Sequence, residues 1–95
     1  MPSNERPLRD VLQEILKSYR LEDHLDETSL IGNWEKVTGK MISAHTTNLF
    51  ISNKVLYITV DSAALRQELL YRKEKLLELL NKPAGKEVIR DIVFR

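Results

Sequence analysis

The stretch NLFISNKVLYITVDSAALRQELL, residues 48–70, decides the fold because the spacing of its apolar side chains changes along its length. Over residues 48–60 the side chains alternate with a period of two, which predicts two β-strands. The segment Ser52–Lys54 separates them, and its central asparagine is favoured in tight turns, so the two strands form a hairpin. From Ala63 onward leucines recur every three or four residues, which predicts a helix directly after the hairpin.

The predicted helix covers residues 63–82, and Asp61 or Ser62 can cap its first turn. Its apolar stripe contains Leu65, Leu69, Leu76 and Leu80. Pro83 ends the helix because proline cannot continue the hydrogen-bond pattern. The chain closes with EVIRDIVFR, whose apolar residues predict a strand over residues 88–94 that is buried on much of both faces. Since a helix between two strands is a crossover, we expect this third strand to join the hairpin in one sheet.

Upstream of the hairpin the sequence predicts helices. Residues 7–19 have apolar side chains at three- and four-residue spacing, and Pro7 suits the first turn of such a helix. The acidic segment 22–28 has no apolar pattern. A second helix follows it, with one stripe formed by Leu30, Trp34, Val37 and Met41. Gly39 is expected to break this second helix into two, because glycine destabilises a helix interior by about 1 kcal/mol.

The stripe makes Trp34 a core residue, expected to pack against the first helix and the long helix after the hairpin. Together with Trp34, the expected core contains Val37, Leu65 and Leu69. These elements predict an α+β fold with the order α-α(α)-β-β-α-β, in which helices cover a three-stranded sheet. Because 95 residues allow only one modest core, we expect a single domain over residues 7–95, after a flexible N-terminus over residues 1–6.

The composition narrows the possible chemistry. The chain contains no cysteine, and its two histidines, His24 and His45, stand 21 residues apart without the converging partners of a metal site or a catalytic group. Glycine-rich phosphate loops are absent too. We therefore expect no catalytic activity, no metal ion, no cofactor and no small-molecule substrate. With no secretory signal and no apolar run long enough to span a membrane, we expect a cytoplasmic protein without a membrane partner.

The net charge of +1 conceals a gradient, because residues 1–27 carry a net charge of −3 and residues 28–95 a net charge of +4. A basic surface in the second region predicts contact with the phosphates of a nucleic acid. The residues expected to form it lie outside the apolar stripes, on helix faces, turns and loops: Lys40, Lys54, Arg66, Arg72, Lys73, Lys82 and Lys86. Binding is expected to be weak and sequence-tolerant, because Phe50 and Tyr57 are expected to serve the sheet rather than to stack on bases.

Three segments together resemble the DciA family of bacterial replicative-helicase loaders: WEKVTGKMISAHT at residues 34–46, LYITVDSAALRQEL at 56–69 and VIRDIVFR at 88–95. The resemblance extends from about Leu8 to Arg95. It implies a KH-like domain, which is consistent with the element order above, although the GxxG loop of RNA-binding KH domains is absent. It also implies a non-enzymatic DNA-replication protein that binds the replicative DNA helicase and, weakly, single-stranded or double-stranded DNA.

Two alternatives stay open. The first is a protein-interaction adaptor that does not bind nucleic acid and uses its acidic N-terminal helix as the contact surface. The second is an RNA-associated KH-like protein of the ribosome or its assembly. A pull-down from a bacterial lysate, with and without nuclease, distinguishes these functions. Recovery of the helicase under nuclease favours the loader, recovery of ribosomal proteins favours the RNA-associated protein, and recovery of neither leaves the adaptor.

Overall fold

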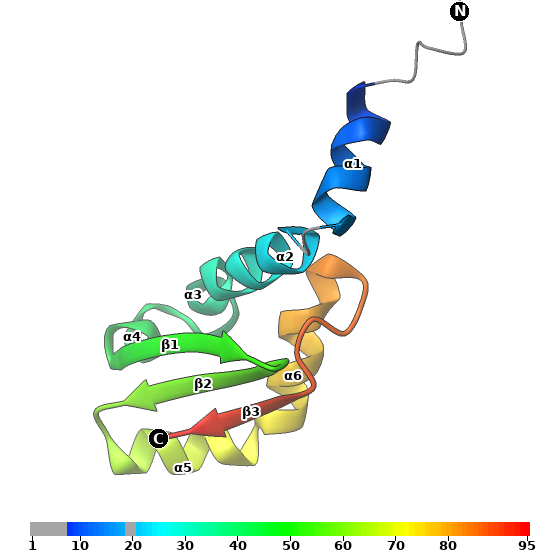
Figure 1. The fold of residues 1–95 in the computed structure, drawn as a ribbon. Helices are drawn as coiled ribbons and strands as arrows, with labels where there is room; N and C mark the ends of the chain where they lie inside the picture. The colour runs from blue at the N-terminus through cyan, green and yellow to red at the C-terminus, as the bar shows by residue number, and fades with distance from the viewer. Residues whose placement is uncertain (1–7, 19–20) are drawn as a thin grey trace, which may run out of the picture.

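The computed structural model describes residues 8–18 and 21–95 (Figure 1). The predicted flexible N-terminus at residues 1–6, and Pro7 after it, lie outside the described residues. Along the described chain the elements are α1 (Leu8–Ser18), α2 (Leu21–Gly32), α3 (Trp34–Thr38), α4 (Lys40–Ala44), β1 (Thr46–Ser52), β2 (Val55–Val60), α5 (Ala63–Tyr71), α6 (Lys73–Asn81), the 3-10 turn η2 (Lys82–Ala84) and β3 (Asp91–Phe94). These helices and strands confirm the predicted α+β class.

The three strands form one mixed sheet in the order β1-β2-β3. β1 and β2 are antiparallel and joined by a two-residue turn, in which Asn53 and Lys54 have φ angles of 51° and 64°. A hairpin turn with two positive φ angles matches the right-handed twist of the strands that it joins. β3 runs parallel to β2 and pairs Ile92 with Leu56. The crossover through α5 and α6 therefore confirms that the third strand joins the hairpin.

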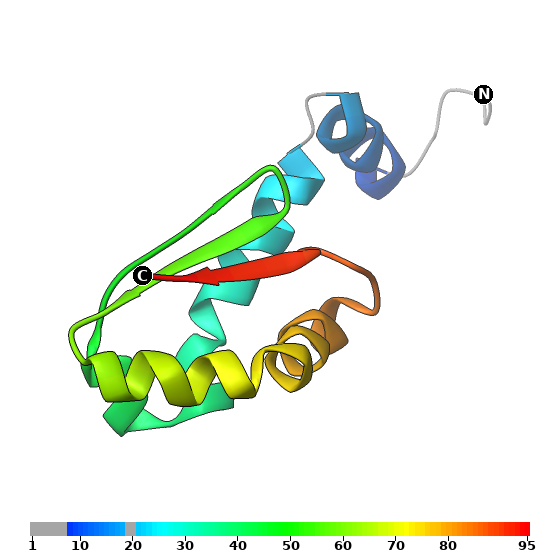
Figure 2. The same ribbon diagram turned by 90° about the horizontal axis from the view of Figure 1, so that it is seen from below.

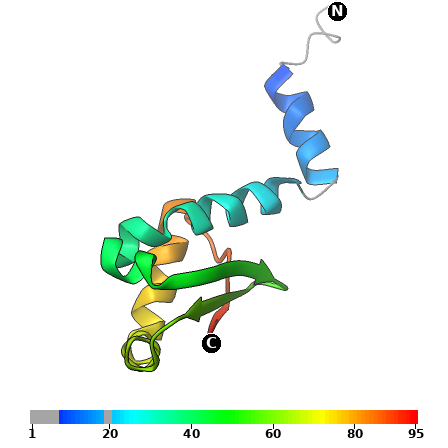
Figure 3. The same ribbon diagram turned by 90° about the vertical axis from the view of Figure 1, so that its left-hand side faces the viewer.

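Helices cover one face of this sheet. In Figures 2 and 3, α5 and α6 lie along one side of the three strands, and none of the described helices lies over the other side. Leu56, Ile58 and Val60 of β2 point to the covered face and are buried. Residues from the helices, from β3 and from the segment before β3 complete the core: Leu30, Trp34, Leu69, Leu76, Leu80, Val88, Ile89 and Ile92.

Trp34 is 2% exposed, as expected of a core residue, but its surroundings differ from the prediction. Its indole Nε1 donates a hydrogen bond to Thr46 Oγ1 over 3.0 Å, and α3 packs on α6. The first helix, α1, projects away from the sheet (Figure 1), so the prediction that Trp34 packs against this helix is wrong. Leu69 is also buried, and Val37 and Leu65 are half-buried against the core.

The position of α1 follows from α2. The acidic segment 22–28, which shows no apolar pattern, is helical and forms most of α2. Glu22 and Asp23 lie in its first turn, where carboxylates interact favourably with the free N–H groups of the helix. Thr28 Oγ1 donates a hydrogen bond to the carbonyl oxygen of His24 within the same helix. Because this extra helix separates α1 from Trp34, α1 lies at the far end of α2 and away from the core (Figure 1).

The predicted long helix over residues 63–82 is divided at Arg72, so this prediction is wrong in detail. Arg72 has φ −100° and ψ 9°, and its N–H donates to the carbonyl oxygen of Leu69 over 3.0 Å, which closes the last turn of α5. No glycine or proline stands at the break. Leu69 on α5 and Leu76 on α6 are both buried, and the change of direction allows both helices to follow a twisted sheet.

Gly39 separates α3 from α4, as predicted. Its φ of 95° and ψ of 167° are readily adopted by glycine and rarely by other residues. Met41 was predicted to belong to the buried stripe, but it is 65% exposed, so this prediction is wrong. The chain changes direction at Gly39, and Met41 therefore no longer lies on the same side as Trp34. Ile42 packs against the core in its place.

The last strand is shorter than predicted, because β3 begins at Asp91 rather than at residue 88. Val88 and Ile89 are nevertheless buried, and the side chain of Asn81 at the end of α6 binds their backbone. Asn81 Oδ1 accepts hydrogen bonds from the N–H groups of Val88 and Ile89, both over 3.0 Å, and Asn81 Nδ2 donates to the carbonyl oxygen of Ile89 over 2.9 Å. These bonds replace the strand pairing that residues 88 and 89 lack.

Candidate nucleic-acid interface

Two of the predicted cations, Lys54 of the hairpin turn and Lys86 of the loop before β3, line the same cavity. They line a shallow cavity of about 180 Å³, together with the carboxylates of Asp23, Asp26, Glu27 and Glu87. Lys86 Nζ lies 2.7 Å from Asp26 Oδ2, and this interaction with Asp26 raises the pKa of Lys86. The acidic residues that line this cavity outnumber the lysines. The ion pair with Asp26 connects Lys86, in the loop before β3, to α2.

Arg72 and Lys73 lie at the corner where α5 meets α6. Arg72 is 71% exposed and lies 3.5 Å from Glu68, an exposed pair of the kind that contributes little. Lys73 Nζ is closer to its partner, at 2.6 Å from Asp91 Oδ1 of β3. The hydrogen bond from Lys73, and then the one from the backbone N–H of Ile92, hold the pKa of Asp91 below its ordinary value. Lys73 therefore connects α6 to β3, whereas the guanidinium of Arg72 faces solvent.

The remaining predicted cations are Lys40, Arg66 and Lys82. Lys40 in α4 and Lys82 in η2 are exposed. Arg66 on α5 is half-buried, and its Nε has no hydrogen-bond partner within the described part of the chain. Since α4 and η2 lie toward opposite ends of the sheet (Figure 1), the seven predicted residues are distributed along the whole domain.

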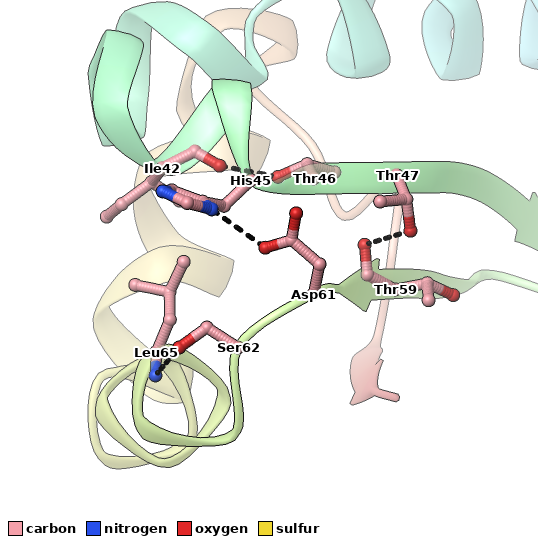
Figure 4. Close-up of polar contacts among 8 residues, drawn as sticks. All are labelled: Ile42, His45, Thr46, Thr47, Thr59, Asp61, Ser62 and Leu65. Carbon is pink, nitrogen blue, oxygen red and sulfur yellow. Dashed lines mark hydrogen bonds and ion pairs between the residues drawn. The ribbon is translucent and has the colours of Figure 1, made fainter.

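A network of polar side chains surrounds the end of the hairpin that lies opposite its turn (Figure 4). His45, at the end of α4, places its Nδ1 2.7 Å from Asp61 Oδ1, just beyond β2, and both side chains are about half exposed. Thr46 Oγ1 donates to the carbonyl oxygen of Ile42 over 2.8 Å. The Ser62 hydroxyl accepts the N–H of Leu65 over 3.2 Å and caps α5.

The His45–Asp61 pair was not predicted from the sequence, but the strand register contains the signal. The hairpin pairs Thr46 with Val60, so the residues just outside that pair meet, and the N–H of Asp61 also donates to the carbonyl oxygen of His45 over 3.1 Å. A histidine held by an aspartate is part of many hydrolytic sites. Here the neighbouring Ser62 hydroxyl is occupied as a helix cap, and His45 ends α4. This network has a structural role, because it connects α4, β2 and α5.

Three side chains on the uncovered face of the sheet form a stack, the aromatic ladder of Phe50, Tyr57 and Arg95. The rings of Phe50 and Tyr57 are 4.8 Å apart between centroids, with an angle of 11° between their planes. Arg95 Cζ lies 4.8 Å from the centroid of Tyr57. Both aromatic residues were expected to serve the sheet, but their stacking was not predicted. The two-residue turn at Asn53 and Lys54 could have predicted it, because that turn places residue 50 opposite residue 57.

The structure thus defines a small α+β domain with exposed cations and a sheet face that the described helices leave uncovered. Within residues 8–18 and 21–95, no group of three or more acidic or histidine side chains is placed to hold a metal ion. Over the same residues, no helix has the length and apolar content needed to cross a membrane. The chain belongs to the DciA family, described as "Dna[CI] antecedent, DciA", whose model matches residues 7–94. This match confirms the predicted membership.

Curated relatives share modest identity with the chain. A UPF0232 protein of Mycobacterium marinum is 25% identical over 87 residues, covering 92% of this chain and 46% of the relative. A UPF0232 protein of Corynebacterium glutamicum is 32% identical over 60 residues, covering 63% and 34%. A relative from Mycolicibacterium smegmatis, named "UPF0232 protein in recF-gyrB intergenic region", is 30% identical over 79 residues, covering 83% and 41%. The chain spans less than half the length of these relatives. No solved structure is a significant match.

Proposed function

We propose that this domain is a cytoplasmic, non-enzymatic accessory factor of bacterial DNA replication that binds the replicative DNA helicase and, weakly, nucleic acid. Its membership of the DciA family is the observation that carries the proposal. A KH-like arrangement is part of the proposal, and the parallel pairing of β2 and β3 across the two crossover helices supports it. The domain would act mechanically, by occupying a surface of the helicase while the ring closes around single-stranded DNA.

The helicase contact in this proposal is the apolar stripe of α1, formed by Leu8, Leu12 and Ile15. These side chains are 73%, 50% and 44% exposed, and their spacing places them on one side of the helix. The helix projects from the domain (Figure 1), so a partner can approach the stripe without disturbing the core. An amphipathic helix commonly binds by laying its apolar side into a groove of the partner.

The nucleic-acid contact in this proposal begins at the α5–α6 corner. Arg72 is largely exposed there, and its pairing with Glu68 is too weak to withhold the guanidinium from a phosphate. Exposed Lys40 and Lys82 can add further phosphate contacts. Lys73 and Lys86 contribute less, because each is held by a carboxylate. Binding through a few separate cations is expected to be weak, independent of sequence and sensitive to salt.

A pull-down from a bacterial lysate tests the helicase contact. The wild-type domain is expected to recover the replicative helicase after nuclease treatment. The double substitution Leu12→Gln with Ile15→Gln is expected to abolish recovery, because it makes the α1 stripe polar, whereas Gln13→Ala on the polar side of α1 serves as the matched control. Recovery that is equal for all three proteins excludes α1 as the contact. Recovery of ribosomal proteins in place of the helicase supports the RNA-associated alternative.

An adaptor that does not bind nucleic acid is the second candidate. The carboxylates around Lys54 and Lys86 favour it, because they cancel the positive charge at that end of the sheet. Fluorescence anisotropy with a labelled single-stranded DNA at low salt distinguishes the two candidates. Saturable binding that disappears as salt is added supports the first candidate, and no binding at any salt concentration supports the adaptor.

A further inference from the structure

The aromatic ladder lies across all three strands, on the face of the sheet that the described helices leave uncovered. Phe50 and Tyr57 are direct partners in the β1–β2 register, and Arg95 follows β3. The backbone holds Arg95 in place, since its N–H donates to the carbonyl oxygen of Ile58 over 2.7 Å and its carbonyl oxygen accepts the N–H of Val60 over 3.0 Å. The ladder is therefore built into the sheet.

The two sides of each ring have different neighbours. Phe50 covers one face of Tyr57, and because β2 lies between β1 and β3, Arg95 covers the other. Phe50 is 39% exposed and stands on the edge strand β1, so no further strand lies beside the face of its ring that points away from Tyr57. A guanidinium that lies over an aromatic ring still presents its N–H donors at its edge.

The charges on this face favour an anionic partner. Asp91 shares the face with Tyr57, because it pairs with Val55 in the register, but its carboxylate is bound by Lys73. Arg95 is exposed, and no carboxylate side chain pairs with it among the described residues. A flat apolar surface at one end of the ladder and a cation at the other match a nucleotide chain, in which aromatic bases alternate with phosphates.

We propose that the uncovered face of the sheet binds single-stranded nucleic acid, with a base stacked on the free face of Phe50 and a phosphate held by Arg95. This inference rests on the nucleic-acid binding proposed above and adds a surface and a mode of contact to it. A single strand is required, because both faces of a base in a duplex are already covered by its neighbours. Stacking on one ring tolerates every base, since each has a flat aromatic face.

The test compares two labelled oligonucleotides of about twelve nucleotides, one of thymidine and one without bases, because binding sites for single strands span roughly 4–16 nucleotides. At low salt the wild type is expected to bind the thymidine strand about five- to tenfold more tightly than the abasic strand. Phe50→Leu is expected to remove this preference, and Phe50→Tyr, which keeps a ring, to retain it. Arg95→Gln is expected to weaken binding of both strands and to lower the salt slope by about one.

Retention of the full preference for thymidine in Phe50→Leu overturns the inference. If Phe50→Leu unfolds, cross-linking of wild-type protein to an iodouracil-containing strand decides instead, with a cross-link to Phe50 expected and cross-links confined to α5 and α6 overturning the inference. If the stacking on Phe50 is overturned in either way but Arg72→Gln weakens binding of the strands, the nucleic-acid binding of the proposed function still stands. Wild-type protein that binds neither strand at low salt overturns nucleic-acid binding altogether, while the helicase pull-down remains an independent test of the other contact.

Discussion

The side chain of Asn81 and the backbone of Ile89 are joined by hydrogen bonds in both directions, and a third bond links Asn81 to Val88. These three bonds hold the buried segment before β3 against the end of α6. A single asparagine therefore satisfies two N–H groups and one carbonyl group that have no partner in the sheet.

Asn81→Ala is expected to destabilise the domain by about 2–4 kcal/mol, because it leaves the partly buried N–H and carbonyl groups of Ile89 without partners, whereas the N–H of Val88 keeps its bond to the carbonyl oxygen of Lys86. Asn81→Asp keeps the acceptor for both N–H groups but places an acceptor oxygen against the carbonyl oxygen of Ile89, so it is expected to restore only part of the lost stability. Thermal unfolding followed by circular dichroism measures the difference, and Asn81→Ala is expected to lower the melting temperature by about 10 °C or more. Equal melting temperatures for Asn81→Ala and the exposed control Lys82→Ala would contradict this role.

Trp34 and Met41 belong to the same predicted stripe but differ in burial, at 2% and 65% exposed. Trp34→Ala is therefore expected to cost about 3–5 kcal/mol, a large share of the stability of so small a domain. Met41→Ala is expected to change stability by less than about 0.5 kcal/mol. Urea unfolding of both variants measures the two values. Trp34 is the only tryptophan, so a wild-type emission maximum typical of exposed indole would contradict its burial.

The features that could be predicted depend on local rules. The hairpin follows from the alternation of side chains around Asn53, and the break between α3 and α4 follows from Gly39, because glycine acts on the backbone where it stands. The break at Arg72 could not be predicted in this way. It depends on Leu69 and Leu76 both reaching a twisted sheet, and no residue near the break favours a bend by itself.

The candidate site was only partly predictable for a similar reason. The sequence identifies the basic residues, but it does not show which of them form ion pairs within the domain. Lys86, for example, is paired with Asp26, which lies 60 positions earlier in the chain. The apolar stripe of α1 does not show whether this helix is buried. An amphipathic helix can pack against its own domain or against another protein, and the sequence pattern is the same in both cases. The ladder of Phe50 and Tyr57 required the strand register, which the turn at Asn53 supplies.

The ion pair of Lys73 and Asp91 predicts a dependence of stability on pH. The pKa of Asp91 is lower in the folded state than its ordinary value, so its contribution to stability is fully present above the unfolded pKa of about 4 and is lost as the pH falls through the folded pKa. Asp91→Asn is expected to be less stable than wild type at neutral pH, with the difference shrinking as the pH falls below about 4.

Urea midpoints measured between neutral pH and about pH 3 provide the test for Asp91. The control is Glu78→Gln, which removes an exposed pair with Lys75 at 3.6 Å and is expected to change neither the midpoint nor its pH dependence. Parallel pH profiles for wild type and Asp91→Asn would show that the carboxylate of Asp91 does not stabilise the fold.

Arg72 and Lys73 are neighbours, but the structure predicts different results for their replacement. Arg72→Gln is expected to weaken binding of single-stranded DNA at low salt and to lower the salt slope by about one, without changing the melting temperature, because its guanidinium is exposed and weakly paired. Lys73→Gln is expected to lower the melting temperature by about 2–4 °C, because it removes the contact of α6 with Asp91 of β3. Anisotropy titrations at several salt concentrations, combined with thermal unfolding, separate the two effects. If Arg72→Gln lowers the melting temperature as much as Lys73→Gln does, or leaves DNA binding unchanged, the α5–α6 corner is a structural joint rather than a phosphate contact.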